Sequence, residues 1–207
     1  MTDMSIKTGH ADPVDQHEAI SIQNAKLAMW VYLASEVVIF SVFIAAYVLF
    51  RIRQPEAVKG VHEEVGVYLV TFNTFLLLTS SWAMVMGLRQ IQRGNRQGLN
   101  FWLGITALLG TIFVALQYYE YQELAHIGVT LGMNSDLFSG FGMRFYTPTA
   151  FHGLHVIIGV IWCLLVMRHA ARGGYSARNY VGVEVFGLYW HFVDVVWILL
   201  FTLIYLV

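Results

Sequence analysis

Hydrophobic and polar residues alternate along this chain in long blocks rather than in short periods. Five apolar blocks of 22 to 24 residues are separated by segments that carry the charges: Leu27–Phe50, Val65–Leu88, Gly98–Tyr119, Phe145–Met167 and Val185–Val207. A helix of that length reaches about 33–36 Å, which exceeds the ~30 Å hydrocarbon core of a bilayer by enough for a modest tilt. Strands of a membrane barrel would alternate over about 10 residues, and these blocks do not. The pattern therefore predicts an all-α integral membrane bundle of five transmembrane helices.

The predicted helices belong to one membrane domain, residues 26–207, and cover 27–50, 65–88, 98–125, 145–168 and 182–207. The segments between them are short, so we expect neighbouring helices to run antiparallel. Residues 1–25 are polar and acidic and form a predicted N-terminal tail. The tail lacks the basic start and apolar stretch of a secretory signal.

Composition supports the membrane assignment. Apolar residues make up 57% of the chain and charged residues only 12%, whereas soluble domains carry roughly 25% charge. An aromatic content of 15% excludes a disordered chain. The net charge of −1 provides no electrostatic basis for binding nucleic acid. Since Cys163 is the single cysteine, the chain has no internal disulfide and no zinc site built from four cysteines or from two cysteines and two histidines.

Lys and Arg residues predict the orientation in the membrane. The N-terminal tail and the segments after the second and fourth helices carry eight of them, and the opposite side carries four. Basic residues are enriched in cytoplasmic loops. We therefore expect the N-terminus on the cytoplasmic side and the C-terminus outside.

Glu36 lies near the middle of the first predicted helix. A carboxylate at that depth costs about 2.5–3.5 kcal/mol on insertion scales, so its presence needs a reason. One interpretation is a proton-exchanging or ligand-facing group, which would fit a small transporter or proton channel. The other is a protonated or hydrogen-bonded group packed between helices, and position alone leaves both open.

The second and third helices carry further polar side chains. Asn73 lies among hydroxyl residues that usually bond between helices. Gln117, Glu120 and Glu123 are spaced three apart on one face, which suits carboxylates that reach the interface. Glu123 and His126 have the Glu-x-x-His spacing of a di-iron ligand pair, but such bundles need two pairs facing each other. The interfacial interpretation is favoured, with a metal site as the alternative.

The last two helices carry a denser polar set. His152 and His155 share a face of the fourth helix, and Glu184, His191 and Asp194 share a stripe of the fifth. These side chains could form a buried polar network, which specifies packing when every member is satisfied. They could also be metal ligands or axial haem ligands of a self-contained membrane redox protein. Spacing favours the network and leaves the alternatives open.

Two nine-residue runs in these helices resemble signature segments of a known family. Residues 151–159 read FHGLHVIIG and residues 189–197 read YWHFVDVVW, and both are similar to segments of subunit III of the haem–copper terminal oxidases. Supporting matches follow in the family's order at Ser35-Glu36, Asn73-Thr74, Ser80-Ser81, Gln117, Glu120-Tyr121 and Glu184. The similarity spans about residues 27–207 and fits the five-helix form, which lacks the first two helices of the long form.

The resemblance implies a non-catalytic subunit of a proton-pumping oxidase, with cytochrome c oxidase expected and a quinol oxidase as the alternative. Such a subunit stabilises subunit I and supports proton uptake and sustained turnover in aerobic electron transport to oxygen. The expected partners are subunit I as the main contact, subunit II, a small subunit IV, phospholipids and a respiratory supercomplex. Haem and copper are expected in partner subunits, within a bacterial-type inner (cell) membrane.

The resemblance also implies roles for the polar residues, none of them catalytic or metal-ligating. Glu36 matches a membrane-buried carboxylate of proton-side interest that pumping does not strictly require. The matched interhelix polar groups are structural: Asn73, Gln117, Glu120, His152, His155, Glu184, His191 and Asp194. In the long form, lipid lies in a cleft beside the two extra helices. Bound phospholipid is therefore expected only if another subunit completes that wall.

Overall fold

A computed structural model describes residues 13–55, 67–126 and 141–206 of the chain. Five long helices account for nearly all of this part: α1 (Pro13–Arg53), α3 (Val67–Gln92), α4 (Arg96–His126), α5 (Phe141–Ala171) and α6 (Val181–Phe201), with α6 continuing into a π-helical turn η1 (Thr202–Leu206). Each is long and apolar enough to cross a membrane, and the described part contains no strand. The predicted all-α bundle of five membrane helices is confirmed.

The helices extend beyond the apolar blocks that predict them. α1 begins at Pro13, within the segment assigned to the polar tail, while residues 1–12 lie outside the described residues. α4 continues past its apolar block to His126. A helix satisfies its own backbone hydrogen bonds, so it can leave the hydrocarbon core and continue through polar residues.

The turn between α3 and α4 has a clear local cause. Gly94 has a φ of +77°, a left-handed conformation that favours glycine, and its N–H bonds to the Ile91 carbonyl at 2.8 Å. The Asn95 side-chain oxygen then accepts a hydrogen bond from the Gly98 N–H at 2.9 Å and caps the start of α4. The two helices therefore reverse direction within a few residues and pack antiparallel.

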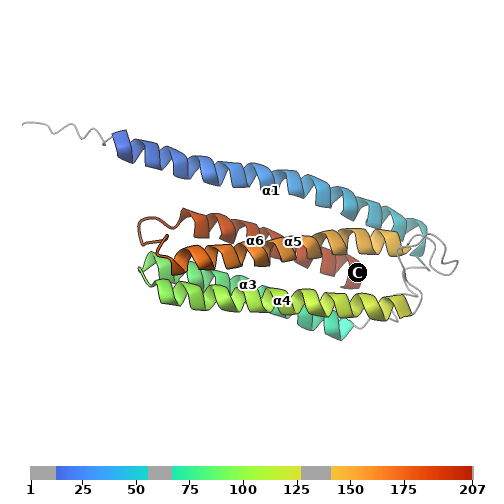
Figure 1. The fold of residues 1–207 in the computed structure, drawn as a ribbon. Helices are drawn as coiled ribbons and strands as arrows, with labels where there is room; N and C mark the ends of the chain where they lie inside the picture. The colour runs from blue at the N-terminus through green and yellow to red at the C-terminus, as the bar shows by residue number, and fades with distance from the viewer. Residues whose placement is uncertain (1–12, 56–66, 127–140, 207) are drawn as a thin grey trace, which may run out of the picture.

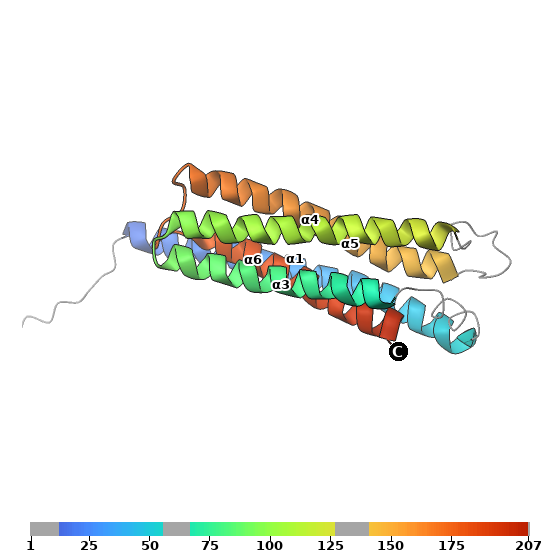
Figure 2. The ribbon, with the colours of Figure 1, turned by 90° about the horizontal axis from the view of Figure 1, so that it is seen from below.

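Four of the helices form a closed group, and the fifth lies against its outside. α3 packs on α4 and α6, and α5 also packs on α4 and α6, so α3 and α5 lie diagonally opposite each other. α1 packs along α5 and α6 (Figures 1 and 2). Because α1 covers only one side of the group, most of its own surface stays uncovered.

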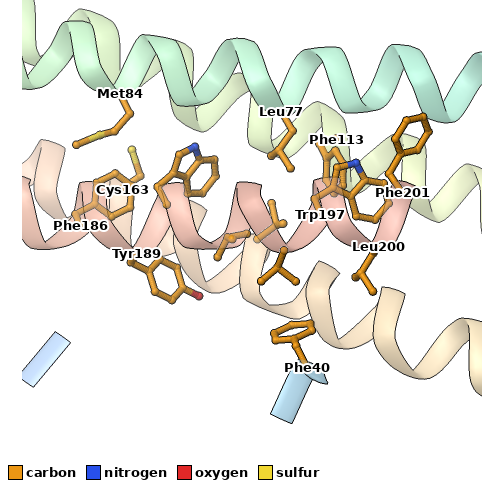
Figure 3. Packing of buried hydrophobic residues seen from close by; sticks show 14 of the residues in the cluster. Phe40, Leu77, Met84, Phe113, Cys163, Phe186, Tyr189, Trp197, Leu200 and Phe201 are labelled. Carbon is orange, nitrogen blue, oxygen red and sulfur yellow. The ribbon is translucent and has the colours of Figure 1, made fainter. Parts of the chain in front are cut away.

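Large aromatic side chains fill the interior of the four-helix group (Figure 3). Trp190 lies over two glycines of neighbouring helices, where an added Cβ would come within 2.7 Å of the indole at Gly110 and 2.6 Å at Gly159. Small residues allow this close approach, and van der Waals packing of this kind holds membrane helices together. The outward faces remain apolar, with exposed side chains such as Trp30, Phe75 and Phe101.

Candidate functional site

The polar residues predicted from the sequence lie mainly in the protein interior. Seven of the nine are buried: Glu36, Asn73, Gln117, Glu120, His152, His155 and Asp194. The other two, Glu184 and His191, are partly exposed. The structure distributes the nine over separate places in the bundle.

Glu36 on α1 faces His155 on α5. The Glu36 Oε2 and His155 Nε2 atoms are 3.4 Å apart, at the long end for a hydrogen bond, and both side chains are nearly inaccessible. The other ring nitrogen of His155, Nδ1, lies 2.8 Å from the Phe151 carbonyl oxygen. A carbonyl oxygen only accepts, so Nδ1 carries a hydrogen. At 3.4 Å the Glu36 Oε2 atom has no hydrogen-bond partner in the described structure, and a hydrogen bond to Nε2 would require a proton on the carboxyl group.

Aromatic rings enclose this acid–imidazole pair. The Phe151 and Phe40 rings lie 4.7 and 5.5 Å from the His155 ring, centroid to centroid. The Tyr189 hydroxyl donates to the His155 carbonyl oxygen at 2.9 Å, and Tyr32 stacks on Tyr189. The pair therefore links α1 to α5 and α6 inside an aromatic shell, in which the Tyr32 side chain also interacts with Glu36.

A second group of polar contacts, called here the α3–α6 seam, lies between α3 and α6. The Ser81 hydroxyl is hydrogen-bonded to His191 Nδ1 at 2.6 Å and also lies close enough to interact with the Asp194 carboxylate. Two indoles donate across the same interface, Trp190 to the Ser80 hydroxyl at 3.0 Å and Trp197 to Thr74 at 2.9 Å. Hydroxyl groups of α3 thus meet imidazole, carboxyl and indole groups of α6 along one helix–helix boundary.

The sequence predictions did not single out the two tryptophans of this seam. A signal for them exists, because Trp190 and Trp197 are seven residues apart and so share a helix face. The hydroxyl residues of α3 that they contact repeat at similar spacing. An indole N–H buried in a membrane helix needs an acceptor, and a facing hydroxyl supplies one.

Gln117 and Glu120 form hydrogen bonds near the C-terminal end of α4. The Gln117 amide donates to the Thr149 carbonyl oxygen of α5 and to the Tyr121 hydroxyl, both at 3.1 Å. Glu120 accepts a hydrogen bond of 2.7 Å from the Tyr205 hydroxyl in η1. These contacts connect α4 to α5 and to the last turn of the described chain.

Asn73 and His152 occupy the centre of the four-helix group. The Asn73 amide donates to the Phe113 carbonyl oxygen of α4 at 3.2 Å. His152 is fully buried, and its ring stacks on the Trp197 indole with 4.9 Å between centroids. Neither ring nitrogen of His152 has a hydrogen-bond partner among the described residues, and the same holds for Asn73 Oδ1.

Glu184 lies at the edge of a groove between α1 and α6. Its carboxylate forms an ion pair of 2.6 Å with Lys26. Beside this pair are two adjoining hollows of about 510 and 290 Å³, which share Trp30, Leu188 and His191 in their walls. The larger hollow is lined almost wholly by apolar side chains.

The groups that could have ligated a metal are not brought together. His152 lies at the bundle centre, His155 faces α1, and His191 faces α3 and the groove. Glu123 and His126 are exposed on the last turns of α4. In the part of the chain that the structure describes, no three His, Cys, Asp or Glu side chains form a group suited to hold an ion.

A sequence model of the family described as cytochrome c oxidase subunit III matches residues 6–207. This chain belongs to the cytochrome c oxidase subunit III family. The prediction of a haem–copper oxidase subunit III, made from two nine-residue runs, is therefore confirmed.

The relatives include subunits of both cytochrome c oxidases and quinol oxidases. Cytochrome c oxidase subunit 3 of Thermostichus vulcanus is 38% identical over 188 residues, which cover 87% of this chain and 86% of the relative. Cytochrome c oxidase subunit 3 of Synechocystis is 40% identical over 176 residues, 84% of this chain and 72% of the relative. Quinol oxidase subunit 3 of Bacillus spizizenii is 34% identical over 180 residues, 87% of this chain and 85% of the relative.

Proposed function

We propose that this subunit III binds no haem or metal of its own. It stabilises subunit I of a proton-pumping oxidase and supports proton uptake and sustained turnover. The proposal rests on the position of the polar side chains, which lie between helices of this chain. Glu36, His155, His191 and Gln117 each face another helix of the same chain, where they support packing. Haem and copper then belong to the partner subunits, which perform the electron transfer and oxygen reduction.

The outward faces supply the surface for those partners. α1 packs on α5 and α6 only on one side, and its remaining surface carries exposed apolar side chains such as Trp30, Val38 and Leu49. Apolar surface of this kind can face lipid or another membrane helix. We assign it to subunit I as the main contact, with subunit II, a small subunit IV and a respiratory supercomplex as further neighbours.

The groove between α1 and α6 is the proposed seat of a bound phospholipid. Its larger hollow of about 510 Å³ has the apolar wall that an acyl chain requires. The Lys26 ammonium at the adjoining hollow is partly exposed and can meet a headgroup phosphate, although Glu184 competes for it. Lipid content of the purified complex, compared between wild type and Lys26→Met, tests this assignment.

The orientation follows from the distribution of basic residues. With the N-terminus cytoplasmic, Lys26, Arg89, Arg93 and Arg96 all lie on the cytoplasmic side of a bacterial-type inner membrane. The C-terminus is then outside. Cysteine labelling with a membrane-impermeant reagent tests this, with a single cysteine placed at position 2 or 207 in a Cys163→Ala background.

We infer cytochrome c as the electron donor of the complex, and quinol is the second candidate because relatives of both names match. The donor is decided in the partner subunits. Oxygen consumption by the purified complex with reduced cytochrome c or with a quinol distinguishes the two candidates directly.

The proposal as a whole is tested by removing this chain from the purified complex. We expect the remaining complex to retain its haem spectrum and its initial rate of oxygen consumption but to lose activity faster over successive turnovers. Re-addition of the purified chain should restore the working lifetime. Stoichiometric haem or metal on the stripped chain would instead support a self-contained redox protein and overturn the proposal.

A further inference from the structure

One layer of the four-helix group brings a side chain from each helix to the bundle centre. Phe113 of α4 and Trp197 of α6 meet there edge to face with 4.8 Å between ring centroids (Figure 3). His152 of α5 contacts both rings, at 5.8 Å from Phe113 and 4.9 Å from Trp197. Asn73 of α3 bonds to the Phe113 carbonyl oxygen, so it belongs to the same layer.

The polar members of this layer have unused hydrogen-bonding capacity. His152 is 0% exposed and Asn73 is 2% exposed, so bulk solvent reaches neither. Both ring nitrogens of His152 and the Oδ1 atom of Asn73 have no partner in the described protein. A neutral imidazole has one donor and one acceptor nitrogen, and an amide oxygen accepts. Leaving such groups bare in an apolar interior is costly, and native proteins seldom do it.

Another protein group is an unsuitable partner for these atoms. The nearest rings, Phe113 and Trp197, present carbon to His152, and the Trp197 N–H already donates to Thr74. The full burial of the layer also excludes contact with a neighbouring subunit. A small molecule that both donates and accepts can bond to one His152 ring nitrogen and to Asn73 Oδ1, and a further one can bond to the other nitrogen; internal water has this role in most proteins.

We propose that this layer is an internal water site, in which water bonds to the His152 ring and to Asn73 Oδ1. Water would accept from or donate to the imidazole according to its tautomer and would donate to the amide oxygen. It would thereby link α5 to α3, the two diagonal helices of the group, which lack extensive direct packing. This assignment is independent of the role of the chain in an oxidase.

Hydroxyl-radical footprinting with mass spectrometry tests the site on the detergent-purified chain with the subunits that accompany it. Radicals formed from a bound water oxidise the side chains next to it, even when these are buried. Trp197 lies against His152, whereas Trp190 is equally buried but packs over Gly110 and Gly159 and bonds to Ser80. We expect Trp197 to be oxidised several-fold faster than Trp190. Equal rates in the wild-type protein would overturn the proposal.

Two variants locate the ligands of the water. His152→Phe and Asn73→Leu should each reduce the oxidation of Trp197 to the level of Trp190. Cys163→Ala, a buried substitution on α5 beside Leu103, should leave the ratio unchanged. An unaltered helix content by circular dichroism is the check on folding. Persistence of the high Trp197 rate in either of the first two variants would refute the bridging site.

Discussion

Replacing Glu36 by glutamine tests the interpretation of the buried acid–imidazole pair. The hydrogen on His155 Nδ1 is directed at a carbonyl oxygen, so Nε2 can accept from Glu36 only if the carboxyl group carries the shared proton. A charged version of the pair would need several further hydrogen bonds to offset desolvation. Glu36 interacts with the Tyr32 side chain, but its Oε2 atom has no hydrogen-bond partner in the described structure. We therefore expect a neutral pair.

A neutral pair and an ionic pair predict different losses of stability for the Glu36 variants. A glutamine amide can also donate to His155 Nε2, so Glu36→Gln should change the stability of a neutral pair by about 1 kcal/mol or less. Glu36→Leu removes the donor and should cost about 1–3 kcal/mol, because one buried nitrogen is left unpaired. If the pair were ionic, Glu36→Gln would strand a buried imidazolium and cost about 3–5 kcal/mol.

The assay is the temperature at which the subunit dissociates from the purified complex, measured for wild type, Glu36→Gln and Glu36→Leu. Infrared spectroscopy supplies the second measurement, since the C=O stretch of a protonated carboxyl group should disappear in Glu36→Gln. We also expect oxygen consumption and proton pumping to remain nearly intact in that variant. A large destabilisation by glutamine would refute the neutral pair, and immediate loss of pumping would refute its structural role.

Three further predictions concern the helix interfaces. His191→Leu should weaken the α3–α6 seam by about 1–3 kcal/mol, because Ser81 loses its partner at 2.6 Å, and normal recovery of the assembled complex after heating would count against this. Trp197→Phe and Thr74→Val should each cost on the order of 1 kcal/mol, and the double variant should cost less than their sum, as a thermal double-mutant cycle can measure. Gly110→Leu should clash with the Trp190 indole that packs over Gly110, and this overpacking should lower the yield of folded chain in detergent. An unchanged yield would contradict the close approach of the indole.

The sequence predicted the burial of some polar residues but not the side chains that they contact. The burial of Glu36 and Asp194 followed from their positions within apolar blocks. Their partners did not follow, because helical spacing shows which residues share a face but not which helix that face meets. His152 and His155 illustrate the difference, since residues three apart on α5 point to different surroundings, one to the bundle centre and the other to α1.

The sequence alone determined the number of membrane helices, their approximate limits and the family. Those properties depend on the length of apolar blocks and on local runs of residues, which are visible without a fold. Tertiary structure decided that α1 lies outside a four-helix group, that Glu36 meets His155, and that the tryptophans of α6 bond to hydroxyls of α3. Every apolar block is long and apolar enough to cross the bilayer, and hydrophobicity alone does not decide which helix lies beside which. Complementary side-chain shapes and hydrogen-bonding groups make that choice, and they act only once the helices are packed together.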